Sequence, residues 1–210
     1  MPVVSLRRAL LAAAILGSLL GALSAFGDAA RTTVVNGLAN AAGPWVVTAF
    51  AAGGLTFRRT HGAVAGSVAL GVAIAWYYGR WVGAQEFPVV FAIAWLILAA
   101  IAGPTFGMLG AIWRTDASRR LLILSVGVLA GALLGEAAHR LVLLEAWGGI
   151  DPARTYTQVA IADTVAAIAL VLALGRGGRW PTLGIAALVA SGWTAVLFGV
   201  DALFRSLPTG

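Results

Sequence analysis

Three ionisable side chains inside an apolar stretch are the first place to look for chemistry in this sequence. Glu136, His139 and Arg140 are spaced i, i+3 and i+4, so on a helix they share a face, in the order that favours a Glu–Arg ion pair. Charged groups within a membrane are costly and usually face a bundle interior, a partner or water. Two interpretations stay open: a ligand site, or an internal Glu136–Arg140 pair with His139 capping it.

Two further polar features interrupt apolar segments. Asp163 is an isolated acid about two turns inward from Tyr156, and we interpret it as functional. Asn36 and Asn40, spaced i and i+4, precede a proline and Trp45 at the start of another segment. This pattern predicts an interrupted helix. The asparagines then either cap it or belong to a broken segment of the kind that exposes backbone groups to a transported substrate.

Aromatic side chains gather near one predicted helix end. Trp76, Tyr77, Tyr78 and Trp81 are typical of the aromatic belt at a membrane interface. Adjacent helical positions cannot all face lipid, so we expect at least one of Trp76, Tyr77 or Tyr78 to point inward. There it would stack on a flat ligand or bind a cation.

The elements that must position these groups are membrane-spanning helices. Of the 210 residues, 60% are hydrophobic and only 10% are charged, whereas soluble domains carry about 25% charged residues. Apolar segments long enough to cross a bilayer, or nearly so, recur along the chain. They are residues 9–27, 34–57, 62–81, 88–113, 121–144, 159–175 and 181–204. We predict one all-α domain over residues 1–210 with seven spanning helices, or six as the alternative. The first segment also has features of a signal peptide, but we interpret it as a retained helix.

The arginines predict the orientation, because cytoplasmic loops are enriched in positive charge. With the N-terminus cytoplasmic, nine of the fourteen arginines lie inside and seven of the eight acids lie at or toward the outside. The basic loops are short and suit contact with anionic lipid rather than nucleic acid. The composition, rich in Ala, Gly and Arg and without Lys, is typical of a GC-rich bacterium. We therefore expect a multi-pass protein of the bacterial cytoplasmic membrane.

Several kinds of chemistry are excluded or incomplete. The chain has no cysteine and no lysine, which excludes thiolate, iron–sulfur and Schiff-base chemistry. It also has no P-loop, so it cannot itself use ATP. Glu136 and His139 match half of a carboxylate-bridged metal motif, but a second copy is missing. We expect no cofactor, no metal and no enzymatic activity, with an intramembrane enzyme using Glu136 and His139 as the third-ranked alternative.

Small residues at four-residue spacing mark helix faces that can approach closely. They occur in the first, fourth, fifth and seventh segments, where internal packing is the ordinary explanation. The stripe of Ala9, Ala13, Gly17 and Gly21 is the one that we predict as a partner-docking face.

Two resemblances follow from these motifs. The pattern of Asn40, Gly43-Pro44-Trp45, Gly103-Pro104 and Gly135-Glu136 is similar to a family of small uncharacterised bacterial membrane proteins, which would supply no activity. The size, the stripe and the outward aromatic residues resemble, more loosely, the substrate-binding S components of energy-coupling-factor vitamin transporters. That resemblance implies docking of a membrane coupling subunit on Ala9–Gly21, together with a cytoplasmic ATPase. Those proteins typically have six helices, whereas we count seven here.

The polar and aromatic candidates fall in the predicted outer half of one bundle. They are Asn36, Asn40, Trp45, Trp76, Tyr77, Glu136, His139, Asp163 and Trp193. We therefore predict a non-enzymatic membrane protein that captures a small aromatic or cationic solute from outside, as a transporter or its binding subunit. The alternative is a scaffold or accessory subunit whose polar residues only hold helices together.

Overall fold

A computed structural model describes residues 5–29, 34–39, 41–79, 89–115, 118–147 and 150–206, which form eight helices. The helices are α1 (Leu6–Ala29), α2 (Val34–Ala39), α3 (Ala42–Gly54), α4 (Arg59–Gly79), α5 (Val89–Thr115), α6 (Arg119–Trp147), α7 (Ile150–Leu174) and α8 (Arg179–Ser206). The predicted all-α class is confirmed. The described part of the chain contains no strand.

Six of these helices are long and apolar enough to cross a membrane: α1, α4, α5, α6, α7 and α8. The protein is therefore a multi-pass membrane protein. The second predicted segment, residues 34–57, is divided into the six-residue α2 and the 13-residue α3. At a rise of about 1.5 Å per residue, α3 alone is roughly 20 Å long and shorter than a bilayer core of about 30 Å.

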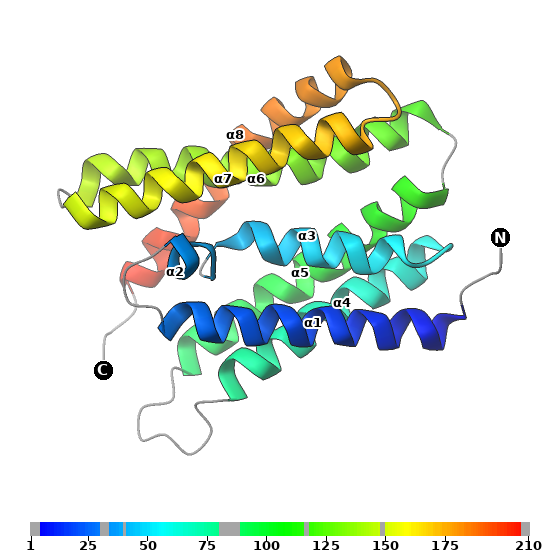
Figure 1. The fold of residues 1–210 in the computed structure, drawn as a ribbon, viewed down its shortest axis with the longest axis horizontal. Coiled ribbons are helices and arrows are strands. Elements are labelled where there is room, and N and C mark those ends of the chain that lie inside the picture. Colours follow the sequence, from blue (N-terminus) through cyan, green and yellow to red (C-terminus); the bar gives the residue numbers. More distant parts are fainter. Residues whose placement is uncertain are drawn as a thin grey trace.

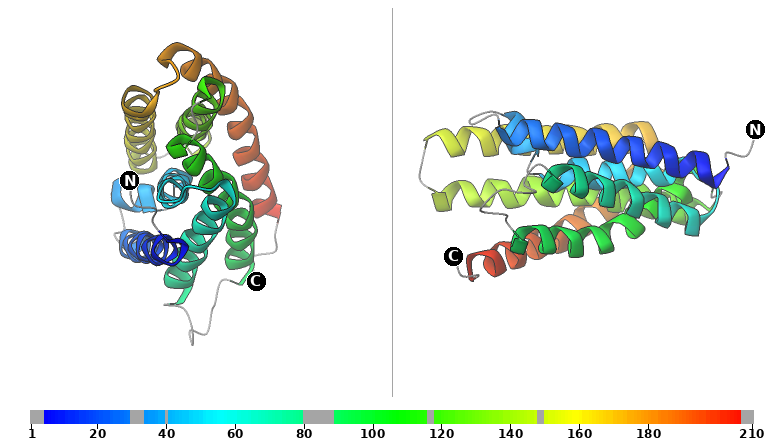
Figure 2. Two further views of the ribbon diagram at one scale, coloured as in Figure 1. Left: turned by 90° about the vertical axis from the view of Figure 1, so that its right-hand side faces the viewer. Right: turned by 90° about the horizontal axis from the view of Figure 1, so that it is seen from below.

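The helices run lengthwise beside one another, and the start of α1 and the end of α8 lie at opposite ends of the bundle (Figure 1). α1 packs against α4, α3 against α4 and α5, and α6 against α7 and α8. Viewed end-on, α3 lies between α6 and α7 on one side and α1 and α4 on the other (Figure 2). The broken segment is therefore central, where two groups of helices meet.

Close helix packing depends on small residues, as the stripes predicted. A Cβ at Gly17 would collide with the backbone carbonyl of Ala69, and one at Gly21 would collide with that of Ala73. α4 and α5 approach equally closely through glycines on both helices, among them Gly66. Backbones this close make many van der Waals contacts. These contacts drive helix association in a membrane, where lipid supplies no hydrophobic driving force between helices.

This packing corrects the docking prediction for the first helix. Ala9 is 2% exposed and Ala13 is fully buried, and Gly17 and Gly21 lie against α4 of the same chain. The small-residue face of α1 is thus already covered, and it does not offer a partner a free surface. The residues of α1 that point outward are large and apolar, such as Leu11 and Phe26.

The predicted basic loops gather at one end of the bundle. Arg119, at the start of α6, donates to the Gly177 carbonyl in the α7–α8 turn over 2.6 Å. In the same turn, the Arg176 guanidinium lies 4.4 Å from the centre of the Trp113 ring at the end of α5. Gly178 has φ +128°, a conformation that glycine adopts without strain, and it lets the chain reverse directly into α8.

Candidate functional site

The candidate site is built around the break between α2 and α3. α2 ends at Ala39 and α3 begins at Ala42, so the backbone N–H groups of the first α3 turn have no partner within their own helix. Pro44 is the third residue of α3, where a missing N–H does not disrupt the helix. The proline therefore marks a helix start in this chain, not the kink that its position within an apolar segment suggests.

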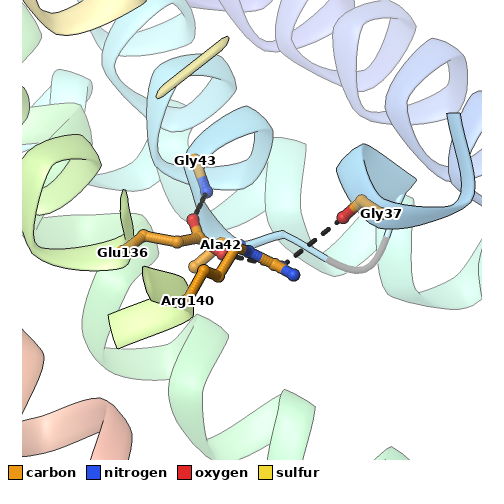
Figure 3. A network of polar contacts seen from close by, with 5 residues as sticks. All are labelled: Gly37, Ala42, Gly43, Glu136 and Arg140. Carbon is orange, nitrogen blue, oxygen red and sulfur yellow. Dashed lines mark hydrogen bonds and ion pairs between the residues drawn. The ribbon is translucent and has the colours of Figure 1, made fainter. Parts of the chain in front are cut away.

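Glu136 of α6 occupies the N-terminus of α3. Its Oε1 accepts a hydrogen bond from the Ala42 backbone N–H over 2.8 Å, and its Oε2 accepts one from the Gly43 N–H over 2.6 Å (Figure 3). A carboxylate is favoured at this position because the aligned peptide dipoles place partial positive charge at a helix N-terminus. The side chain is only 4% exposed. Glu136 is thus a structural cap for a helix more than 90 residues earlier in the chain.

Arg140 completes this network. Its Nη2 donates to Glu136 Oε1 over 3.1 Å and to the Gly37 carbonyl at the longer distance of 3.5 Å. Its guanidinium carbon also lies 5.7 Å from the centre of the Tyr156 ring on α7. One buried ion pair therefore joins α2, α3, α6 and α7, as Figure 3 shows for the first three. The ion pair between Glu136 and Arg140 is confirmed, whereas its capping by His139 stays a prediction.

Asp163 of α7 lies beside the same helix start. It is 3% exposed. A Cβ built on Gly43 would lie 2.9 Å from Asp163 Oδ1 and 3.4 Å from Glu136 Oε2, so the two carboxyl groups flank one glycine. Asp163 Oδ2 is buried and has no hydrogen-bond partner. Asp163, which the sequence marked as a candidate functional residue, is thus a buried acid beside the start of α3.

His139 and Trp193 belong to a different contact. The His139 ring packs edge-on against Phe198 of α8, with ring centres 4.7 Å apart. Trp193 lies over Gly135 and packs edge-on against Phe106, with centres 6.1 Å apart. Both side chains are therefore engaged at helix interfaces that include α8. The prediction that they join Glu136 and Asp163 in one pocket is not supported by these contacts.

An aromatic hollow lies on another side of the α2–α3 break. It encloses about 20 Å³ within a wider opening to the surroundings, and its described lining residues are Ala39, Trp45, Tyr77, Tyr78 and Trp95. Trp45 and Trp95 stack with ring centres 5.7 Å apart and 21° between planes, and the two tyrosine rings meet edge-on at 4.9 Å. Tyr78 is 7% exposed, which confirms the expectation that one of the clustered aromatics points inward.

The remaining predicted site residues lie elsewhere. Trp76 is 56% exposed and points outward from α4, as a membrane-interface residue would. Asn36 donates to the backbone carbonyl of Asp28 over 3.1 Å, joining α2 to the end of α1. Asn40 lies outside the described residues. The outer polar candidates therefore divide into a charged network, an aromatic hollow and separate interhelical contacts.

Two contributions to the site escaped the sequence analysis. The backbone N–H groups of Ala42 and Gly43 carry no side-chain signal, although the Gly-Pro pair at the helix start hinted at them. Trp95 lies in a uniformly apolar segment, in which no polar neighbour distinguishes it. Among the described residues, no group of three or more His, Asp or Glu side chains could hold a metal ion.

Comparison with known proteins places the chain in a family without giving it an activity. A family model, described as a family of unknown function (DUF6518), matches residues 2–205. The chain belongs to this family. No curated protein and no solved structure matches it. The expected membership in an uncharacterised membrane-protein family is therefore confirmed, whereas the comparisons show no resemblance to S components.

Proposed function

We propose that this DUF6518 member binds a small aromatic or cationic solute in the hollow beside the α2–α3 break, and that it does so without catalysis. The observation that carries the proposal is the lining itself. Four aromatic rings from α3, α4 and α5 surround one opening next to an interrupted helix. Broken helices of this kind are where many transporters place their substrates.

The chemistry of the lining selects the ligand class. Aromatic faces carry negative charge density and attract cations, and they also stack on flat rings. The described lining residues carry no ionised side chain, so recognition would rest on ring contacts rather than on an ion pair. The enclosed space of about 20 Å³ is far below the roughly 300–1,000 Å³ typical of ligand pockets. A single-ring compound or a small quaternary amine would therefore enter as the aromatic rings move apart.

Binding of two probes tests the proposal. Tetramethylammonium and indole are titrated against the detergent-solubilised protein, with thermal stability and tryptophan fluorescence as readouts. We expect at least one probe to raise the midpoint of thermal unfolding, and Trp95→Leu to weaken that binding about tenfold or more, because one cation–π or stacking contact is worth roughly 1–2 kcal/mol. Trp180→Leu is the matched control, since Trp180 is 83% exposed and is not part of the hollow.

Two results would overturn the proposal. The first is that neither probe stabilises the protein at millimolar concentration. The second is that Trp95→Leu and Trp180→Leu weaken binding equally. In either case the hollow is only a feature of aromatic packing.

A scaffold or accessory subunit is the second candidate, and one observation favours it. Glu136 and Arg140 are engaged with each other and with α3 inside the chain, which is what polar residues that only hold helices together would do. Purification from the native membrane in mild detergent tests this alternative. Stoichiometric retention of a second membrane protein would support it, whereas co-purification of an ATPase would support the transporter form.

A further inference from the structure

We propose that Asp163 is a proton-binding site within the membrane bundle, holding one exchangeable proton on its Oδ2 atom. This inference is independent of solute binding in the aromatic hollow. It rests on the charges around the start of α3 and on the hydrogen bonds that those charges already make.

The first step is the charge balance. Glu136 and Arg140 neutralise each other at 3.1 Å, and both are largely buried, with side-chain exposures of 5% and 11%. An ionised Asp163 would add one uncompensated negative charge at 3% exposure. Isolated buried charges carry a penalty of several kcal/mol even after the protein relaxes around them. A proton on Asp163 removes that charge.

Among the side chains that the structure describes on the surrounding elements, no other group compensates this negative charge. α2 contains no charged residue, and neither does α3. On α6, the groups near Asp163 are Glu136 and Arg140, and His139 packs toward Phe198 of α8. On α7 itself, Arg154 is exposed and lies more than two helical turns away, toward the start of the helix. On α8, Arg179 is at the opposite end of the helix from Phe198. The positive end of α3 is nearby, but Glu136 already accepts its first two N–H groups.

The second step is the state of the oxygen atoms. Glu136 receives three donors, which fits an ionised carboxylate. Asp163 Oδ1 lies against Gly43, while Oδ2 is buried without a hydrogen-bond partner. An ionised carboxylate would leave its charge on an oxygen to which no protein group donates a hydrogen bond, whereas a carboxylic acid places a proton there. The two acids beside Gly43 thus have unequal roles, one ionised and one protonated.

A proton fits this site better than a metal ion. Hard cations such as Mg²⁺ and Ca²⁺ take six or more oxygen ligands, usually with several carboxylates or waters. Here only two carboxyl groups approach Gly43, and one of them is engaged by Arg140 and the α3 N-terminus. The guanidinium would also repel a second cation, whereas a proton bound covalently to Oδ2 needs no ligand set.

Infrared spectroscopy of the full-length protein in lipid tests the proposal. At neutral pH, the wild-type minus Asp163→Asn difference spectrum should contain the C=O stretch of a protonated carboxylic acid, and this band should shift in D₂O. Raising the pH should remove the band and lower the thermal unfolding midpoint of the wild type more than that of Asp163→Asn. Asp28→Asn is the matched control, because Asp28 is partly exposed near the end of α1, and it should leave the band in place.

If Asp163→Asn does not fold, selective ¹³C labelling of aspartate in the wild type must shift the same band. His139→Gln should leave the band in place, because the His139 ring packs against Phe198 of α8. A spectrum with only carboxylate bands for Asp163 at neutral pH would overturn the proposal. Stability that depends on Na⁺ concentration and not on pH would overturn it too, by assigning the site to a metal cation.

Discussion

Glu136 is the residue on which the centre of the molecule depends. It accepts two backbone N–H groups of α3 and pairs with Arg140 in a buried position. We expect Glu136→Gln to destabilise the protein by about 3–5 kcal/mol, because it leaves a buried guanidinium without its counter-charge. The thermal unfolding midpoint in detergent, compared with that of the wild type, measures this loss.

A double substitution separates the ion pair from the helix cap. Glu136→Gln combined with Arg140→Met removes both charges, so it should be more stable than Glu136→Gln alone. If Glu136→Gln alone is as stable as the wild type, the Glu136–Arg140 ion pair contributes little to the stability of the protein. If the double variant is no better than the single, the lost cap at Ala42 and Gly43, and not the unpaired charge, is the main cause.

The residue scale also shows what could be predicted from sequence. The i, i+4 spacing alone predicts the Glu136–Arg140 pair, because these residues are neighbours on any helix. The contact that His139 makes away from this pair could not be predicted. At roughly 100° per residue, His139 points about 60° away from Glu136, enough to place it against α8. Which neighbour fills each direction depends on the rotation of α6 within the bundle, and that is set by contacts distant in sequence.

At the scale of elements, tight packing between α1 and α4 gives a matched pair of variants. Gly17→Ala should destabilise the protein by about 1–3 kcal/mol, because the added methyl group collides with the Ala69 carbonyl. Gly71→Ala on α4 adds the same methyl group where no atom lies within 4 Å, and should be neutral or stabilising by up to about 1 kcal/mol. Thermal unfolding of both variants in the same detergent makes the comparison. Equal midpoints would contradict close α1–α4 packing.

The elements themselves were largely predictable, and their pairing was not. Hydrophobicity over about 20 residues identifies a spanning helix, because a bilayer demands that length. α7 begins at Ile150, well before the predicted residue 159, because polar residues extend the helix beyond its apolar part and Pro152 is tolerated in the first turn. The stripe on α1 predicted a close contact, but a stripe cannot say whether its partner is α4 or another protein.

For the whole molecule, the arrangement in Figure 1 predicts that the α1 start and the α3–α4 turn share one end of the bundle, while the α1 end lies at the other. The chain has no cysteine, so single cysteines can be introduced without removing native ones. We expect a membrane-impermeant maleimide, added to intact cells or spheroplasts, to label Ala29→Cys and to leave Ser5→Cys and Thr60→Cys unlabelled until the membrane is opened. All three positions are exposed. The physical reason is the excess of arginine at the end shared by Ser5 and Thr60, since positively charged loops remain cytoplasmic.

Labelling of Ser5→Cys and Thr60→Cys instead of Ala29→Cys would reverse the orientation while keeping the fold. Labelling of all three from outside would contradict the crossing of α1.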